Sequence, residues 1–139
     1  MAVPPALQDL SKACENQLKQ IVLAFRSWAG DNDGRYPFNL SKDQGGTKEF
    51  CSVGGDGFDR NAAKHLQVMG SELSATKILV CPADSSRTPA SDFQHLESKN
   101  VTYQIRSAAS VNEASPKEVI VRCPIHGLVA LCDGSVQRN

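Results

Sequence analysis

The stretch ALQDLSKACENQLKQIVLAFRSWAG, residues 6–30, decides the fold of this chain. Its apolar residues recur at steps of three or four, which places them along one side of a helix. They are Leu7, Leu10, Cys14, Leu18, Ile21, Phe25 and Trp28. Pro4 and Pro5 suit the entrance of a helix, and Gly30 suits its end, where a left-handed residue is common. The pattern predicts a helix about 36 Å long, with one face buried against the rest of the chain.

Length and charge narrow the kind of protein. A chain of 139 residues, 40% of them hydrophobic, is expected to form one domain, residues 1–139, around one core. Lysine and arginine together number 15, as do aspartate and glutamate, so the chain is neutral. A nucleic-acid partner is not expected, because binding to nucleic acid depends on neutralising phosphates. No apolar stretch of the sequence approaches the roughly 18 residues that a membrane span needs.

A loop and a short helix are predicted over residues 35–76. Residues 35–57 are rich in glycine, serine, aspartate and lysine, which indicates a long surface loop. Asp59 is a favourable N-cap for a helix over residues 60–69, because its carboxylate can accept from the first N–H groups. Gly70 follows as the expected end of this helix.

The periodicity changes to two from residue 77 onward, which is typical of strands. An antiparallel sheet of four to five short strands is predicted over residues 77–138, at residues 78–81, 101–106, 118–123, 128–132 and 135–137. The run at 128–132 is apolar on both faces and is predicted to be central. Asp133-Gly134 predicts a type I′ hairpin turn, which needs positive φ at both residues. The fold class is therefore α+β, with the sheet laid on the long N-terminal helix and a second short helix beside it.

Two Cys-Pro steps stand out among the cysteines, which are Cys14, Cys51, Cys81, Cys123 and Cys132. Cys81 and Cys123 each end a predicted strand, so their side chains can face each other across neighbouring strand ends. Three readings stay open: a disulfide between them, unlinked buried thiols, or a zinc site completed by His126 and Asp84. The disulfide is favoured, because structural zinc sites usually draw on Cys-x2-Cys pairs and each half here offers one thiol. A disulfide would also favour an oxidising compartment.

Catalysis is not expected, and no cofactor is assigned. Cys123 or Cys132 could act as a nucleophile with His126 as its base, but no glycine-rich turn follows either cysteine to supply an oxyanion hole. Cys132 lies inside an apolar strand, where a thiol is usually inert. His65 and His95 fall in the short helix and in a polar loop, and both are predicted to be plain surface residues.

Two segments near the start resemble a known family. ACENQLKQI at residues 13–21 and WAGDNDGRYP at residues 28–37 look like the early part of type IV pilin-like proteins. More narrowly, they are similar to the major pseudopilin-like proteins of bacterial type II secretion. Many of those carry a helix reading N-x-L-K-Q-I-x-L-A, followed by D-x-D-G-R-aromatic-P. Two later segments, ILVCPAD at residues 78–84 and CPIHGLVALCDGSV at residues 123–136, are also similar to that group.

The resemblance implies a pilin-like fold and a structural, non-enzymatic subunit of a pilus-like or type II secretion pseudopilus filament. It implies two kinds of partner: copies of the same chain, joined through the N-terminal helix, and other pseudopilins or secretion-system components. Such proteins carry an apolar membrane segment ahead of the matching region. We therefore expect this chain to be the soluble part of a protein anchored in the inner membrane, periplasmic or at the cell surface. The alternative is a small zinc-binding module using Cys81, Cys123 and His126.

Two departures limit what the resemblance implies. Six residues separate His126 from Asp133, fewer than in many relatives, so no family role is carried over to His126. Some pseudopilins bind calcium near the C-terminus, but this sequence has no obvious cluster of carboxylates there. No calcium site is predicted.

Overall fold

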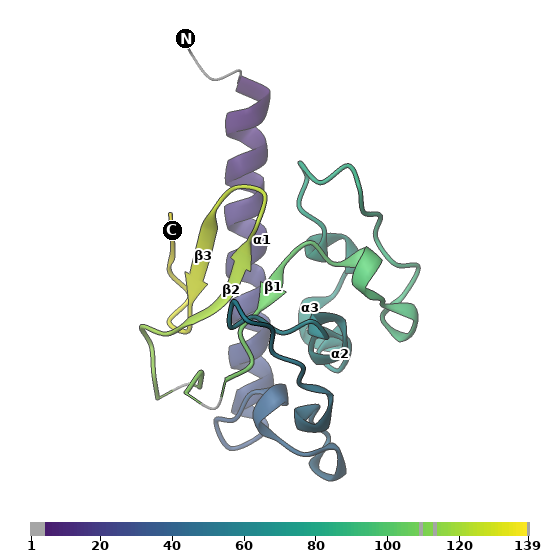
Figure 1. Ribbon diagram of the computed structural model, residues 1–139, viewed down its shortest axis with the longest axis vertical. Helices are drawn as coiled ribbons and strands as arrows, with labels where there is room; N and C mark the ends of the chain where they lie inside the picture. The colour runs from purple at the N-terminus through teal and green to yellow at the C-terminus, as the bar shows by residue number, and fades with distance from the viewer. Residues whose placement is uncertain (1–4, 109, 113, 139) are drawn as a thin grey trace.

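The computed structural model describes residues 5–108, 110–112 and 114–138, with side chains from Leu10 onward. Within these residues the α-helices are α1 (Pro5–Gly30), α2 (Ala62–Gln67) and α3 (Gly70–Leu73). The strands are β1 (Gln104–Ile105), β2 (Val119–Cys123), β3 (Leu128–Leu131) and β4 (Val136–Arg138). Short 3-10 helices lie between them: η1 (Pro37–Asn39), η2 (Lys42–Gln44), η3 (Lys48–Phe50), η4 (Thr76–Leu79), η5 (Phe93–His95) and η6 (Ser98–Asn100). The fold is α+β, as predicted, with a long N-terminal helix beside an antiparallel sheet (Figure 1).

Helix α1 confirms the predicted long helix and its buried face. The apolar stripe is buried at each position from residue 14 onward: Cys14, Leu18, Ile21, Phe25 and Trp28. Leu23, on the other side of the helix, is 62% exposed. The predicted stripe residue Leu7 lies outside the described side chains. Among the residues described, no helix is both long enough and apolar enough to cross a membrane.

The end of α1 differs from the prediction. Gly30 is the last helical residue, and positive φ falls instead on Asp33 (φ 59°) and Gly34 (φ 75°). The N–H of Gly34 donates to the carbonyl of Ala29 at 2.8 Å, and the Asn32 side-chain amide donates to another carbonyl of the last turn at 2.7 Å. The turn after the helix, rather than Gly30, therefore satisfies the terminal carbonyls.

The sheet has the strand order β1-β2-β3-β4, with every neighbouring pair antiparallel. Neighbours in the sheet are thus neighbours along the chain, as expected for strands joined by short connections. β3 is buried at every residue and is flanked on both sides, which confirms the predicted central strand. β2 and β3 pack against α1, and the first turns of the helix extend beyond them (Figure 1).

The turn between β3 and β4 is not type I′. Gly134 has a φ of 91°, but Asp133 does not have a positive φ. The N–H of Gly134 donates to the Leu131 carbonyl, and the N–H of Leu131 donates to the Ser135 carbonyl, both at 2.9 Å. Residues 132–134 therefore form a three-residue loop with glycine in the left-handed position, the next most common way to join a hairpin.

The strand predicted at residues 78–81 is wrong. Residues 76–79 form η4, and its buried side chains pack against α1 and α3 rather than within a sheet. A run of apolar residues can be buried by a helix as well as by strand neighbours, so its composition does not decide between the two. The strand predicted at 101–106 is shortened to β1.

The helix predicted at residues 60–69 is shortened to α2, and a separate short helix, α3, follows it. Asn61, and not Asp59, is the residue before α2, and Gly70 begins α3 instead of ending a helix. The N–H of Asp59 donates to the carbonyl of Ile105 at 2.7 Å, so this residue attaches the start of α2 to the edge strand β1. Its carboxylate accepts hydrogen bonds in a buried network that is described below.

Gly46 is a position where the fold has no room for a side chain. A Cβ there would lie 2.1 Å from the backbone oxygen of Leu40, a group that cannot rotate away. We expect Gly46→Ala to lower the free energy of unfolding by about 1–3 kcal/mol, because the loop must shift to relieve the overlap. Urea unfolding measures this loss. The matched control is Gly55→Ala, where a Cβ meets nothing within 4 Å, and its expected change is within about 0.5 kcal/mol. Equal losses in the two variants would contradict the close approach.

Candidate metal centre

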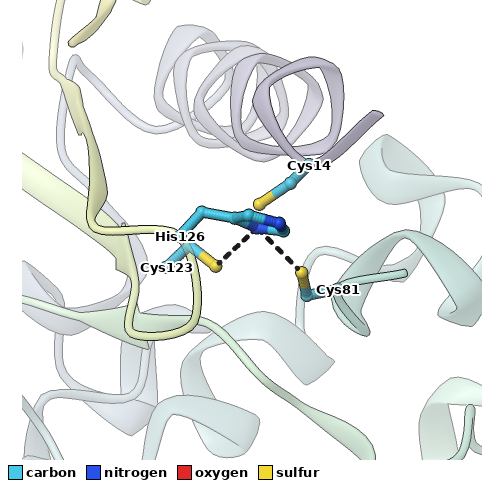
Figure 2. A group of neighbouring side chains, drawn as sticks. All are labelled: Cys14, Cys81, Cys123 and His126. Carbon is cyan, nitrogen blue, oxygen red and sulfur yellow. Dashed lines mark hydrogen bonds between the residues drawn. The ribbon is translucent and has the colours of Figure 1, made fainter. Parts of the chain in front are cut away.

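Four side chains with metal-binding atoms converge between α1 and the ends of two loops (Figure 2). Cys14 comes from α1, Cys81 follows η4, Cys123 ends β2, and His126 lies in the turn to β3. Their ligand atoms all lie within 4.8 Å of one another. Nδ1 of His126 is 3.3 Å from Sγ of Cys81 and 3.7 Å from Sγ of Cys123. Cys81, Cys123 and His126, which the sequence had suggested as a group, are thus brought together, and Cys14 joins them.

One short turn supplies two of the four side chains. Pro124 has no N–H and so stops the ladder of β2 directly after Cys123. Gly127 adopts a φ of 69° and donates its N–H to the Cys123 carbonyl at 3.0 Å, which returns the chain into β3. The imidazole of His126 is thereby placed beside the Cys123 sulfur. The signal that sequence reasoning missed is this Cys-x2-His spacing, which pairs two ligands in one turn as Cys-x2-Cys does.

The loop after Cys81 is held by hydrogen bonds from a neighbouring segment. The N–H of Cys81 donates to Oγ1 of Thr102 at 3.0 Å, and that hydroxyl donates to the Asp84 carboxylate at 2.7 Å. Asp84, considered as a possible fourth ligand, is therefore not in the cluster. Burial acts to raise the pKa of Asp84, but hydrogen bonds from Ser86, Thr102 and others outweigh it and lower the pKa to about 2. Asp84 therefore positions Cys81 through Thr102 and is not itself a member of the cluster.

Cys14 was predicted only as part of the buried stripe of the helix. Its sulfur lies 3.5 Å from the hydroxyl of Tyr103, and the side-chain oxygen of Gln17, one turn further along α1, lies 2.5 Å from the same hydroxyl. Burial raises the pKa of Tyr103, so its hydroxyl keeps its single proton, and the Cys14 sulfur and the Gln17 oxygen compete for it as acceptors. The helical periodicity accounts for Cys14 as a core residue, and nothing local in the sequence connects it to the distant Cys-Pro steps.

The sulfurs differ in how easily they lose a proton. The hydrogen bond between the thiols raises the pKa of Cys14 and lowers the pKa of Cys123 to about 5, and the backbone N–H of His126 adds to the lowering while burial opposes it. Burial raises the pKa of Cys81. Cys132, outside the cluster, has its pKa raised to about 11 by burial, as expected for an inert thiol. The thiols of Cys14 and Cys123 therefore affect each other's ionisation, whereas Cys132 lies apart from them.

The structure holds all five cysteines as unlinked thiols, and all five lie in its described part. Cys81 and Cys123 are neighbours in the cluster, which is the proximity that both the disulfide and the zinc readings require. The covalent bond between them stays a prediction. Cys51 and Cys132 lie apart from the four-residue cluster.

A second polar cluster surrounds His65, and the prediction of a surface histidine there is wrong. His65 is fully buried on the inner face of α2. Its Nδ1 lies 2.6 Å from Oγ1 of Thr47, and its Nε2 lies 2.9 Å from the Asp59 carboxylate. Burial lowers the pKa of His65, so the ring is neutral at pH 7 and its two nitrogens act as one acceptor and one donor. His95, by contrast, is exposed as predicted, with its ring beside Asp92.

The network around Asp59 is closed to ligands. Burial acts to raise the pKa of Asp59, but hydrogen bonds from Ser107 and His65 outweigh it and lower the pKa, so the carboxylate is ionised. The same carboxylate also accepts from the backbone N–H of Ser52 and Asn61. A hydroxyl, an imidazole and a carboxylate in a row resemble the atoms of a hydrolase triad. The hydroxyl here belongs to Thr47, a residue that is only 2% exposed, so a substrate could not reach it.

Comparison with known proteins adds no relative to this picture. No protein-family model, curated protein or solved structure matches the chain. A function for the chain must therefore come from its long helix, its sheet, the cluster of metal-binding side chains and the residues that carry the resemblance.

Proposed function

We propose that the chain is the soluble domain of a pilin-like filament subunit of the type II secretion pseudopilin kind, and that it has no catalytic site. The observation that carries the proposal is the way α1 lies on the sheet, with one part packed and the other extending beyond it. Helix α1 spans 26 residues, and its C-terminal part is packed under β2 and β3 while its first turns extend beyond them (Figure 1). A helix held at one end and free along the other can pack against copies of itself in a filament core.

The segments that carry the resemblance support the proposal by their places in the fold. Residues 13–21 lie in the middle of α1, and residues 28–37 form its last turn and the connection to η1. Residues 123–136 run from the end of β2 through β3 to the start of β4. A pilin-like domain is expected to consist of a long helix and a sheet, and these segments lie in those two parts of the fold. Residues 78–84, which also carry the resemblance, form the end of a 3-10 helix and a turn beside α1.

The exposure of α1 changes along its length in the sense that filament packing requires. From residue 14 to residue 29 the stripe facing the sheet is buried. Leu10, Ser11 and Ala13 are each half-exposed, so the packing surface of the domain ends near this level. In the proposed filament, contacts with neighbouring subunits begin here, and an apolar segment ahead of α1 holds the subunit in the inner membrane before assembly. The domain then lies in the periplasm or at the cell surface.

Crosslinking in an assembling strain tests the proposal. The chain is joined to the leader and apolar segment of a major pseudopilin and produced in a bacterium that lacks its own major pseudopilin. A photoreactive residue at position 12, on the exposed side of α1, is expected to crosslink subunits into a ladder of oligomers. The control carries the same residue at position 68, where Val68 is exposed after α2. A folded, membrane-inserted protein that stays monomeric in both variants would contradict the proposal.

A second candidate, a small zinc-binding module, is favoured by the four-residue cluster. Cys81, Cys123 and His126 lie within bonding reach of one ion, together with Cys14. The two candidates do not exclude each other, because a metal can hold a structural subunit together. The metal is taken up separately below.

A further inference from the structure

We propose that Cys14, Cys81, Cys123 and His126 bind one zinc ion, and that this ion fastens helix α1 to the two Cys-Pro turns. The proposal goes beyond the filament role, since it concerns how the isolated domain is held together. It also adds a ligand, Cys14, from an element that is far in sequence from the other three.

The first support is the spacing of the ligand atoms. Zinc binds sulfur at about 2.3 Å and imidazole nitrogen at about 2.0–2.1 Å, so the corners of a tetrahedral site lie about 3.5–3.8 Å apart. Nδ1 of His126 is 3.3 Å from one sulfur and 3.7 Å from another, and no pair among the four atoms exceeds 4.8 Å. The side chains already surround a common centre (Figure 2). Small rotations of the cysteines would complete a tetrahedron.

The second support is the donor set. Three thiolates and one imidazole are a recognised ligand set for structural zinc, and soft sulfur donors select zinc over magnesium or calcium. Cys14, Cys81 and Cys123 are buried, while His126 is half-buried at the surface of its turn. Four protein ligands leave no open position for a substrate, so the site is structural and not catalytic.

The third support is the surrounding layer of hydrogen-bond donors. Zinc with three thiolates carries a net negative charge, which must be offset by donors to sulfur when the site is buried. The backbone N–H groups of His126 and Ala83 point at the sulfurs of Cys123 and Cys81. The Tyr103 hydroxyl points at the third sulfur, that of Cys14. The Cys81 and Cys123 sulfurs therefore each have a backbone N–H donor, and the Cys14 sulfur shares the Tyr103 hydroxyl with Gln17.

The alternatives to a zinc ion at this site engage fewer of the four side chains. A Cys81–Cys123 disulfide would engage two of the four groups and leave a buried thiol and the imidazole beside it without a role. The other group with metal-ligand spacing in the described residues, Cys51 with Asp59 and His65, is different. There the carboxylate and both ring nitrogens are already engaged in protein hydrogen bonds. Of these two groups in the described part of the chain, one would be completed by a metal and the other needs none.

The site has a mechanical consequence for α1. Cys14 lies at the level where the helix passes from buried to half-exposed, and its ligand partners come from the loop after η4 and from the turn between β2 and β3. An ion at this point ties three separate segments of the chain together. It therefore fixes the position along α1 at which the helix stops packing against the rest of the domain.

Metal analysis of the full chain tests the site. The protein is purified with reductant and without chelator, and we expect one zinc ion per chain. Cobalt(II) added to metal-free protein is expected to give the visible bands of a tetrahedral site together with thiolate-to-cobalt charge transfer. Cys14→Ser and Cys123→Ser should each weaken zinc binding at least a hundredfold. The matched control, Cys51→Ser, removes a thiol outside the cluster and should bind one equivalent as before.

A variant that leaves all four ligands in place tests the site even if the ligand variants fail to fold. Tyr103→Phe keeps the ring in the core and removes only the hydroxyl that faces Cys14, so zinc affinity should fall about 10- to 100-fold. Chelation should lower the melting temperature of the unaltered chain. Less than a tenth of an equivalent of zinc after reduction and zinc addition, with no tetrahedral cobalt spectrum, would overturn the proposal. Because these readouts use monomeric protein in solution, they do not depend on filament assembly.

Discussion

Replacing Asp59 by alanine is expected to lower the free energy of unfolding by about 3–5 kcal/mol, the loss typical when one partner of a buried charged network is removed. The Asp59 carboxylate accepts from Nε2 of His65, from the hydroxyl of Ser107 and from two backbone N–H groups. Truncation leaves the donors of His65 and Ser107 buried without an acceptor, and each unsatisfied donor costs about 1–3 kcal/mol. Water that enters the space left by the carboxylate recovers part of this loss, so the expected total is smaller than the sum of the individual costs.

Urea unfolding at pH 7, followed by circular dichroism, measures the loss in Asp59→Ala. Asp56→Ala is the matched control, because Asp56 lies three residues earlier and its side chain is about half exposed in an ion pair with Arg122 at 2.8 Å. Exposed pairs of this kind contribute about 0–1 kcal/mol. A similar loss in both variants would show that the buried network does not stabilise the domain.

Replacing Phe25 by alanine is the second change with a large expected effect, a loss of about 3–5 kcal/mol. Phe25 is fully buried on the core face of α1. Its ring meets the edge of Tyr36 at 5.5 Å between centroids and that of Phe38 at 5.8 Å. These two aromatic residues hold the segment after α1 onto the helix, so the cavity left by Phe25 lies at a junction of two segments. Such a cavity closes only in part, and the transfer and cavity costs add.

The control for Phe25→Ala is Leu23→Ala on the same helix. Both variants introduce alanine into the middle of α1, so any change in helix propensity favours alanine in each case. Leu23 is exposed, and we expect its loss to stay within about 0.5 kcal/mol. Thermal and urea unfolding of the two proteins should therefore separate clearly. If Leu23→Ala were as destabilising as Phe25→Ala, the assignment of the core face of α1 would be wrong.

The elements that could be predicted from the sequence are those whose pattern is local. The stripe in α1 and the alternation and turn residues around β2, β3 and β4 each lie within one short segment, and each element is present. The period of two expected from residue 77 onward does not hold for residues 78–81, which are apolar at successive positions, so either a strand or a helix-packed segment could bury them. The true neighbour of these residues, α1, is about sixty residues away in the chain and was not identified from the sequence.

The same limit applies to the candidate site. Cys81 and Cys123 could be paired in advance, because each precedes a proline at an expected strand end. Cys14 could not be added, because the helical period already accounted for it as a core residue. The sequence predicts an exposed His65 because it gives no sign that Thr47 and Asp59 contact the ring. Tertiary packing brings these two residues to it. Side chains that are polar in isolation become core residues when a distant segment supplies the matching donors and acceptors.

The order of the elements along the chain also has a consequence during synthesis. The strands that cover α1 begin at residue 119, about a hundred residues after the middle of the helix. At about 5–20 residues per second, translation of that interval takes on the order of 5–20 seconds. Over that time the helix has emerged, but the strands that cover its apolar face have not yet been made. Part of the apolar face of α1 therefore stays uncovered in the nascent chain until the last strands are made.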